Sequence, residues 1–467
     1  MRIESAMTYE RIFRNGIFRK DEMKYDVAII GSGMGGLCAG ALLAHRGYKI
    51  LVVEDASRLG GRCSTEEIDG YLLSTGAVAI HRGGVLEDIY REVGAKLELV
   101  DMPHQFYRMG SMEGRNFEMP AKGAVGALLD IANSLEKNRA KMLGHIAREV
   151  ATEKVMRFFG RGEKGKENAE DITFRDWLLK YTENELAHKT FDAMACNVTG
   201  YHIHELTASE MFAIFAGMRT YKSLGVAPHG NEANMKSLAE VIETGGGQIL
   251  INTPARRIVV QDRSVSGIVV EKDGQDIEVS SRAVISNTGP RNTVRLAGEK
   301  HFDSAYLDLT GKINPVGMIL VHVASDEPLC LKEGELGGVL IVGLRRLTSA
   351  FPLTNFSPDL APEGKHLLYC VGSPPSYLEP VSLEEEFEKT TLDLKDQFPE
   401  FEKSGSILKF EIVFQELPQP GRIRIPRQTP VKNLFNVGDG VQDLGSGGTS
   451  AAAESAKEVV DLISKNL

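Results

Sequence analysis

Apolar runs separated by glycine-rich turns predict alternating strands and helices at the amino-terminal end of the chain. Residues 25–30 form a short apolar run rich in β-branched side chains, and GSGMGG follows directly at 31–36. Small and apolar residues then continue to Arg46, which predicts a helix with Gly47 as its carboxyl cap. A second apolar run at 48–53 predicts another strand. The order of elements is therefore strand, tight turn, helix and strand.

This order is the setting in which a GxGxxG turn binds a dinucleotide. Gly31 permits the tight turn, Gly33 lets a pyrophosphate approach the backbone, and Gly36 lets the helix pack on the strand. Glu54 follows the second strand, where its carboxylate can accept hydrogen bonds from ribose hydroxyls. A glycine-rich loop that binds nothing is the alternative interpretation. The complete order of strand, helix, strand and acid favours the dinucleotide.

A cation after the second strand distinguishes FAD from a nicotinamide cofactor. The stretch RLGGRCST supplies a flexible turn at Gly60 and Gly61, followed by Arg62. Arg62 can lie beside a pyrophosphate whose other face is held by the amino terminus of the first helix. A nicotinamide-binding domain needs no such group, so the sequence predicts FAD.

The carboxyl-terminal segment predicts the second half of the same site. Residues 434–437 form an apolar strand candidate, and Asp439 follows it at a position suited to a ribityl hydroxyl. A helix of small residues is expected to begin near 448–450. Its amino terminus would direct a partial positive charge at the flavin, which would stabilise the negative charge of the reduced ring.

The middle of the chain continues the mixture of helices and strands. Residues 237–243 are predicted to be helical, and 248–251 are predicted to return as a strand. Asp273-Gly274 between two β-branched runs predicts a hairpin.

A second region is predicted by separate signals. ThrPheArgAsp at 173–176 and ThrAlaSerGlu at 207–210 are typical of capping boxes that open helices. The apolar runs 317–323 and 366–371 are strand candidates for a second sheet under those helices. Trp177, the only tryptophan, is expected in the core.

Composition excludes several classes of protein. The hydrophobic fraction of 42% and charged fraction of 25% indicate a globular chain, and the net charge of -10 argues against nucleic acid as a partner. The five cysteines are scattered without a CxxC spacing, which favours a reducing cytoplasm. The uncharged run 27–44 has the length of a membrane span, but its interior glycines favour the strand, turn and helix.

The segments together resemble the superfamily of FAD-dependent phytoene desaturases and amine oxidases. The resemblance is carried by GSGMGG with Glu54, GGRCST, DGYLLSTGA at 69–77, GGGQILINTPARRIVV at 245–260 and NLFNVGDG at 433–440. The middle segment is most similar to the branch of carotenoid desaturases and saturases. The resemblance implies that the backbone of Ala255 contacts the adenine and that the segment with Ala77 and Val78 runs beside the flavin ring.

The predicted FAD ligands combine the spacing arguments with this resemblance. They are Gly31, Ser32, Gly33, Gly35, Gly36, Glu54, Asp55, Gly60, Gly61, Arg62, Ala77, Val78, Ala255, Gly438, Asp439, Gly447, Gly448 and Thr449.

The predicted architecture is a discontinuous, Rossmann-like α/β domain for FAD and a second α+β domain for the substrate. The first is assigned to 24–95, 233–298 and 406–467, and the second to 96–232 and 299–405, with 1–23 as an amino-terminal extension. Two departures from the family pattern, Gly230-Asn231 and residues 443–447, lie on the substrate side, so the substrate does not follow from the resemblance.

Three further features have both a functional and an ordinary interpretation. His81 lies beside the expected flavin and is the catalytic candidate, with an ordinary loop histidine as the alternative. His202 and His204 have no third ligand at a recognisable spacing, so no metal is expected. Segment 143–159 mixes apolar and charged residues, which fits a packed helix or peripheral membrane contact.

The resemblance implies an FAD-dependent oxidoreductase that transfers a hydride between flavin N5 and a hydrophobic isoprenoid or polyene, as a desaturase, saturase or isomerase. A flavin amine oxidase is one alternative, although the chain has no Trp or Tyr after Tyr377 to frame an amine. A non-enzymatic protein that binds prenylated proteins, similar to the GDP dissociation inhibitors, is the other. Those proteins lack an intact flavin site, whereas Glu54, Arg62 and Asp439 are present here.

Overall fold

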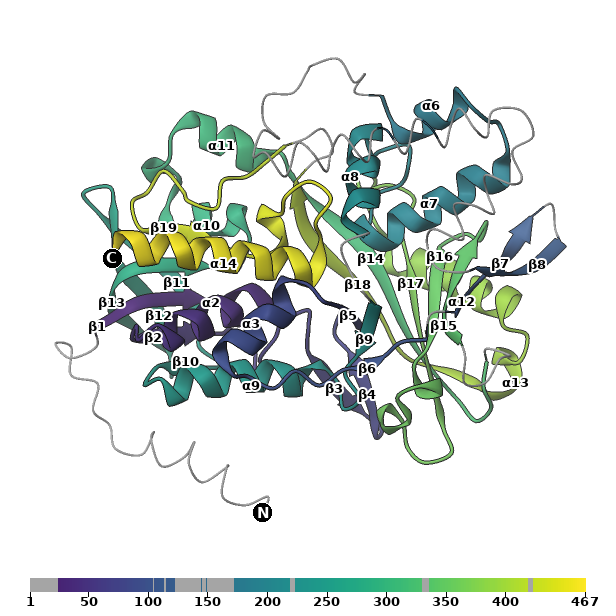
Figure 1. Ribbon diagram of the computed structural model, residues 1–467, viewed down its shortest axis with the longest axis horizontal. Coiled ribbons are helices and arrows are strands. Elements are labelled where there is room, and N and C mark those ends of the chain that lie inside the picture. Colours follow the sequence, from purple (N-terminus) through teal and green to yellow (C-terminus); the bar gives the residue numbers. More distant parts are fainter. Residues whose placement is uncertain are drawn as a thin grey trace.

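The computed structural model describes residues 24–103, 105–112, 115–121, 172–218, 223–329, 336–418 and 423–467, together with Gly144 and Arg148. The predicted extension 1–23 and nearly all of segment 143–159 lie outside the described residues. Two seven-stranded sheets with flanking helices organise the described chain, one at each side of the view in Figure 1. This arrangement confirms the predicted α/β fold.

The first sheet is built around the glycine-rich turn. Its order is β10-β2-β1-β13-β12-β11, with β19 paired to β13. Its strands are β1 (Lys24–Ile30), β2 (Ile50–Val53), β10 (Gln248–Leu250), β11 (Ala255–Gln261), β12 (Ser264–Lys272), β13 (Gln275–Ser286) and β19 (Leu434–Asn436). β1 pairs in parallel with β2 and β13. The buried residues of β1 and β2 are apolar, because parallel strands are covered on both faces.

The predicted hairpin of this sheet is confirmed. β12 and β13 pair in antiparallel fashion, and Asp273 and Gly274 between them have φ values of 51° and 75°. Two positive φ angles are what a two-residue hairpin turn requires, and Asp-Gly adopts them readily.

Helices cover both faces of the first sheet. One face carries α2 (Met34–His45), α3 (Val85–Val93), α9 (Asn231–Thr244) and α14 (Gly448–Asn466), whose apolar side chains share one core with β1 and β2 (Figure 1). On the other face, side chains of α10 (Pro290–Ala297) and α11 (Ser304–Gly311) share a core with those of β11 and β12, and η1 (Glu299–His301) lies between the two helices in the chain. A Cβ on Gly40 of α2 would lie 2.7 Å from Ile242 Cδ1, so a larger residue there would displace the Ile242 side chain where α2 packs on α9.

The second sheet has the order β18-β14-β17-β16-β15-β7-β8. Its strands are β7 (Gln105–Met112), β8 (Arg115–Ala121), β14 (Ile313–Ser325), β15 (Leu336–Val342), β16 (Leu347–Pro352), β17 (His366–Gly372) and β18 (Gly405–Pro418). The strand candidates 317–323 and 366–371 are therefore confirmed, and they pair with each other. β18 pairs with β14 from Gly405 to Pro418, so this strand lies in the second sheet and not with the 406–467 segment to which the sequence assigned it.

Side chains alternate across the second sheet and so define two different surroundings. Ile319, Val321 and Val323 of β14 pack with α12 (Leu383–Gln397) and α13 (Phe401–Ser404). Leu320 and Ala324 share a core with the hairpin of β3 (Thr65–Ile68) and β4 (Tyr71–Ser74), which follows the Gly60-Gly61 turn. The second sheet therefore faces the predicted FAD-binding segments.

Three helices complete the second region. α6 (Phe174–Leu179), α7 (Glu185–Thr199) and α8 (Ala208–Met218) share an aromatic core that includes Trp177, as predicted. Thr173 accepts a hydrogen bond from Asp176 N, and Thr207 and Glu210 cap each other reciprocally, so both predicted caps are present. The remaining described elements are β5 (Ala79–Arg82), β6 (Val100–Asp101), β9 (Ser223–Val226), η2 (Leu353–Asn355), η3 (Pro358–Leu360) and η4 (Asp439–Val441).

The uncharged run 27–44 is divided between β1, the glycine turn and α2. Among the described residues, none of the helices has both the length and the apolar character that crossing a membrane requires.

Candidate functional site

Three separate parts of the chain meet at the glycine-rich turn. Gly60 N donates to Ser32 O at 3.0 Å, and Asn287 N, just after β13, donates to Ile30 O at 2.8 Å. Gly31 and Gly60 have φ values of 94° and 96°, so both turns use the left-handed region that glycine adopts without strain. The amino-terminal and middle segments therefore converge at the carboxyl ends of β1 and β13, where α/β proteins bind nucleotides.

The start of α2 is arranged to receive an anion. Among the described residues no side chain caps its N-cap residue, Gly33, and its first turn contains no acidic residue. Its first N–H groups are therefore left for a ligand, and the helix dipole favours a negative one. A Cβ on Gly36 would lie 2.1 Å from Gly31 O, which agrees with the packing role that the spacing predicts for Gly36.

Glu54 lies beside this turn at the end of β2. Its Oε2 accepts hydrogen bonds from Ser32 N and Ser32 Oγ, both at 2.7 Å, and its Oε1 accepts one from Ala56 N at 2.9 Å. Its backbone oxygen accepts from Thr253 N, which brings the start of β11, and with it Ala255, to the same end of the sheet. A carboxylate has further lone pairs, so Glu54 can accept a ribose hydroxyl in addition. The neighbouring Asp55 is exposed.

Arg62 and Asp439, predicted from opposite ends of the chain, contact each other directly. Arg62 Nη2 donates to Asp439 Oδ1 at 2.8 Å, and Asp439 raises the pKa of Arg62. The Arg62 side chain is 42% exposed and the Asp439 side chain 14%. A guanidinium has further N–H donors, so Arg62 can hold Asp439 and an anion together.

The flavin-side segment, residues 74–78, is held from three directions. Ala77 N donates to Arg62 O at 2.8 Å, and Ala77 O accepts from Asn231 Nδ2 of α9 at 2.8 Å. Gly76 O accepts from the Tyr369 hydroxyl of β17 at 2.7 Å. The segment therefore connects the Arg62 turn to both sheets, and Val78 packs in the apolar cluster between them.

His81, in β5, lies beside the start of α14. Its Nδ1 is 3.3 Å from Ser450 Oγ, in the first turn of that helix. Burial lowers the pKa of His81 to about 4, so the imidazole is neutral near pH 7. The catalytic assignment of His81 stays a prediction.

The start of α14 resembles the start of α2. Its N-cap residue is Gly447, no described side chain caps it, and its first turn has no acid. Gly448 has a φ of 53°, and Thr449 is buried in the first turn. Gly438, at the end of β19, has a φ of 109° and donates its N–H to Ser455 Oγ of α14. Gly447, Gly448 and Thr449 therefore form the start of α14, and Gly438 lies against its interior at Ser455.

Sequence reasoning did not identify three residues at this site. The Asn287 side chain lies within 3.0 Å of the positions that a Cβ would take on Gly33, Gly35 and Gly438, so it occupies the centre between the turn and the carboxyl-terminal loop. Asn231 and Tyr369 hold the flavin-side segment as described above. Asn287 directly follows a long strand, in the stretch SNTGP. A polar residue at the end of a strand was the sequence signal that could have identified it.

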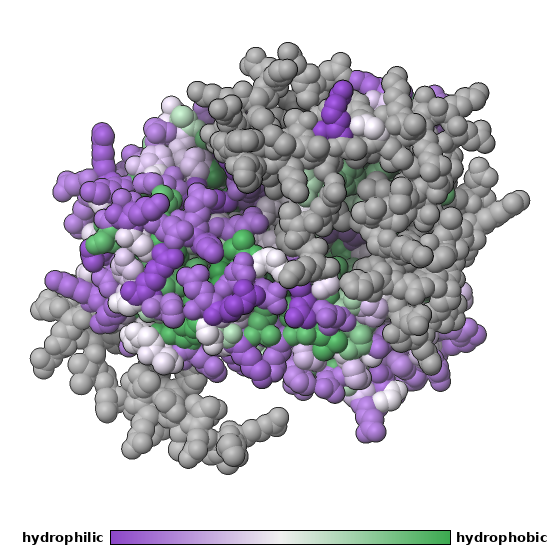
Figure 2. Space-filling view, in the orientation of Figure 1, coloured by the Kyte–Doolittle hydropathy of each residue, from purple (hydrophilic) through white to green (hydrophobic). Residues whose placement is uncertain are grey.

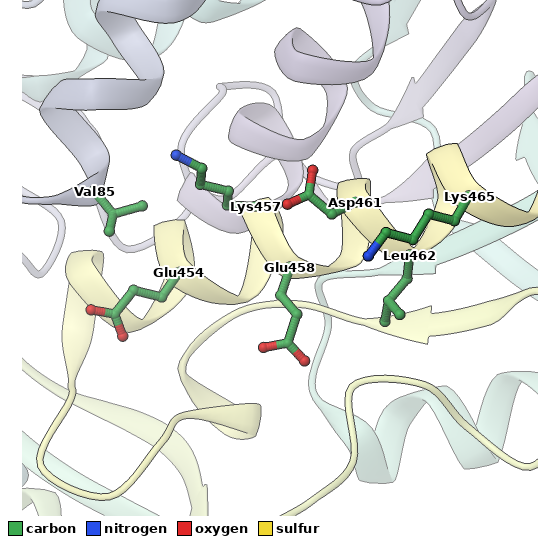
Figure 3. Close-up of a pocket in the computed structure, with 7 residues that line it drawn as sticks. All are labelled: Val85, Glu454, Lys457, Glu458, Asp461, Leu462 and Lys465. Carbon is green, nitrogen blue, oxygen red and sulfur yellow. The ribbon is translucent and has the colours of Figure 1, made fainter. Parts of the chain in front are cut away.

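A groove elsewhere is not part of this arrangement. It has a volume of about 370 Å³ and follows the outer side of α14, where Figure 3 shows both acidic and basic side chains along the helix. Its lining residues are Val85, Glu454, Lys457, Glu458, Asp461, Leu462 and Lys465, none of which is a predicted FAD ligand. Figure 2 shows the same mixed, largely hydrophilic surface over α14.

Comparison with known families matches residues 34–464 to the flavin containing amine oxidoreductases. An uncharacterized protein of Methanocaldococcus jannaschii is 27% identical over 349 residues, which cover 73% of this chain and 76% of that protein. The 15-cis-phytoene desaturase of Capsicum annuum is 22% identical over 473 residues, which cover 94% of this chain and 78% of the desaturase.

Solved structures agree with this match. The crystal structure of an oxidoreductase from Methanosarcina mazei has a TM-score of 0.79 at 25% identity and covers 94% of this chain and 100% of its own. Wild-type putrescine oxidase bound to putrescine has a TM-score of 0.72 at 17% identity, covering 95% of this chain and 100% of its own. The second likeness shows a shared fold.

FAD is the cofactor of this chain, as the sequence predicted, and the described residues fit it. α2 and α14, whose N-cap residues are glycines, offer N–H groups to an anion. Arg62 supplies a cation, and Glu54 and Asp439 supply acceptors for hydroxyls. The individual ligand assignments stay predictions.

Proposed function

The chain belongs to the flavin-containing amine oxidoreductase family, and from this premise we propose that its substrate is a hydrophobic isoprenoid or polyene. It is an FAD-dependent oxidoreductase, and the proposed reactions are desaturation, saturation or isomerisation of that substrate. The similarity to a phytoene desaturase over 94% of this chain supports the substrate class.

The observation that carries the proposal is the apolar surrounding of the flavin-side segment. Val78 and Ala79 share a cluster with Leu224 and Val226 of β9 and with Met318 and Leu320 of β14. A hydrocarbon wall beside the proposed flavin position favours an uncharged, apolar ligand over a charged amine, because burying an unpaired ammonium is costly.

In the proposed mechanism the cofactor carries out the redox step, and the protein binds and orients it. Bound FAD supplies hydride exchange at N5. The residues of this chain bind and orient it: Asn231 and Tyr369 fix the flavin-side segment through Ala77 O and Gly76 O. The first turn of α14 would offer N–H groups to the electron-rich edge of the bound ring. His81, neutral and beside Ser450, is the proposed group for moving a proton.

An amine oxidase is the second candidate, supported by the fold shared with putrescine oxidase. The aromatic side chains near the flavin-side segment weigh against it. The Tyr369 hydroxyl is committed to Gly76 O, and the Tyr369 ring lies 6.3 Å from that of Phe351 with an interplanar angle of 36°, which is not a facing pair of parallel rings. A prenyl-protein-binding function without flavin does not agree with FAD as the cofactor.

The test is anaerobic reduction of the purified flavoprotein. We expect a polyprenoid or polyene, presented in detergent, to bleach the oxidised flavin spectrum or to reoxidise the chemically reduced flavin. A diamine and a monoamine serve as the comparison substrates. Bleaching by amines alone would overturn the proposed substrate class and leave the family and cofactor unchanged.

A further inference from the structure

A cysteine, a histidine and an aspartate meet beside α7, in the region of the second sheet. Asp192 and Cys196 are four residues apart and so lie on one face of the helix. His202 Nδ1 lies 2.8 Å from Asp192 Oδ2 and 3.4 Å from Cys196 Sγ. One side-chain atom of each residue lies within 4.8 Å of the others. The His204 side chain, which the sequence paired with His202, is exposed and is not a member of this group.

The turn after α7 brings His202 back onto the helix. Gly200 has a φ of 77° and donates its N–H to Cys196 O, which ends α7 with a left-handed residue. A Cβ on Gly200 would lie 2.6 Å from Val316 Cγ1, so glycine is required both for the turn and for its packing on β14. The placement of His202 is therefore determined by the fold.

Backbone groups orient the cluster from outside. His202 Nε2 donates to Pro374 O at 2.8 Å, and Ile203 N donates to Asp192 Oδ1 at 2.9 Å. These contacts leave Nδ1, Oδ2 and Sγ facing one another. A histidine that binds a metal usually donates its second ring N–H to a carbonyl or carboxylate in this way, which fixes the tautomer.

The nitrogen–sulfur separation fits a small tetrahedral ion. With zinc–nitrogen and zinc–sulfur bonds of about 2.0 and 2.3 Å, a tetrahedral nitrogen–sulfur separation is about 3.5 Å. The separation in this cluster is 3.4 Å. The nitrogen–oxygen separation of 2.8 Å has to widen by about half an ångström, and the Asp192 side chain, 31% exposed, has room to rotate.

An approach from solvent borders the cluster. A cavity of about 240 Å³ is lined in part by Gly200, Ser373 and Pro374, which flank His202 and Cys196. Cys196 itself is 1% exposed, and the His202 side chain is 15% exposed. The three ligand residues do not line this cavity, so an ion would reach the cluster past the partly exposed side chains of His202 and Asp192 while the thiolate stays buried.

We propose that Asp192, Cys196 and His202 bind a zinc ion that fastens the end of α7 to the turn that follows it. A thiolate, an imidazole and a carboxylate form a donor set that suits zinc, with the fourth position taken by water. Binding replaces the proton on His202 Nδ1 and the proton on Cys196 Sγ, and both are released to solvent. The site is separate from the predicted FAD ligands and does not depend on the proposed substrate.

The experiment measures metal in the purified flavoprotein. After equilibration with Zn²⁺ and removal of unbound ion, we expect about one zinc per chain by elemental analysis. Replacement by Co²⁺ should give the strong d–d bands of a four-coordinate site, which lie at longer wavelength than flavin absorption. Affinity should increase with pH, because the ion competes with two protons.

Variants identify the ligands. We expect Cys196→Ser, His202→Gln and Asp192→Asn each to weaken zinc binding by about tenfold or more. The matched control is His188→Gln on the same helix, whose Nε2 contacts Thr182 O instead. It should bind zinc as the parent does. Flavin content reports whether each variant is folded.

Two results would overturn the proposal. One is a parent protein that retains no more zinc than the folded Cys196→Ser variant and gives no cobalt d–d bands. The other is a folded Cys196→Ser protein that binds zinc with unchanged affinity and cobalt spectrum. The parent measurements decide the question even if a ligand variant fails to fold.

Discussion

The carboxyl end of the first sheet and the contact between β16 and α12 differ in whether their polar groups have partners within the protein. At the first, the starts of α2 and α14 have no described side-chain cap, and Arg62 is 42% exposed. At the second, Asp393 is 0% exposed and accepts from the backbone N–H groups of Arg345, Arg346 and Leu347. Unused donors indicate a ligand site, whereas buried, fully paired charges indicate structural support.

The buried contact also contains a second charged pair. Arg346 and Glu386 form a two-point ion pair, with exposed side-chain fractions of 8% and 4%. Because both partners are buried and hydrogen-bonded within the protein, this pair supports the fold. The comparison therefore predicts that changes at β16 and α12 affect stability, and changes at the first site affect flavin binding.

The largest effect is expected for Asp393→Ala. The substitution leaves three backbone N–H groups and part of the Arg345 guanidinium without their acceptor in a buried position. We expect a loss of about 3–5 kcal/mol in the free energy of unfolding, measured by urea denaturation. Asp396→Ala is the control, since its exposed pair with the same Arg345 contributes about 1 kcal/mol or less. Equal effects would contradict the structural role of Asp393.

A histidine on β14 makes the stability of the second sheet depend on pH. His322 is 0% exposed, and burial, followed by the positive charge of Lys409, lowers its pKa to about 3. The unfolded chain therefore binds the proton more readily, so the free energy of unfolding falls as the pH decreases from about 6.5 toward 3.

His322→Phe should flatten this acid dependence, with a difference on the order of a few kcal/mol at the acid end. Thermal or urea unfolding across that pH range measures it. His229→Gln, at an exposed histidine, is the control. An unchanged acid slope in His322→Phe would show that protonation of His322 is not linked to unfolding.

Arg62→Ala tests the ligand side of the comparison. Removing the cation beside the start of α2 should weaken FAD retention by about 1.5–3 kcal/mol, or roughly ten- to a hundredfold in dissociation constant, with little change in unfolding of the flavin-free protein. Flavin content after dialysis and fluorescence titration measure it. Arg82→Ala removes a comparable ion pair, with Asp101, outside the predicted ligands. Unchanged flavin binding in Arg62→Ala would remove Arg62 from the site.

The smallest effect is expected for Tyr369→Phe. The Tyr369 hydroxyl links β17 of the second sheet to the flavin-side segment. Loss of the hydroxyl leaves Gly76 O without this donor, and we expect a loss of about 1–2 kcal/mol in the free energy of unfolding together with a shifted flavin spectrum. Phe351→Leu, at a neighbouring ring, is a control for packing alone. A stability loss without a spectral change would limit Tyr369 to a structural role.

Much of the fold was predictable because its signals are local. The glycine turn, the Asp273-Gly274 hairpin, the caps at Thr173 and Thr207 and the buried strands all depend on residues within a few positions of one another. The family and its cofactor were also predicted, since the motifs that carry them are short. The sequence placed 406–418 in the FAD-binding domain, whereas β18 pairs with β14 of the second sheet, because strand pairing is decided by a partner far away in the chain.

The sequence alone therefore determined the local elements, the FAD cofactor and the family of this protein. Only the tertiary structure decided that Arg62 contacts Asp439, that Asn287 lies at the centre of the glycine turn, and that Asp192 and Cys196 surround His202. The physical reason is that backbone preferences act over a few residues, whereas these contacts arise when two sheets and their helices pack and bring distant segments together.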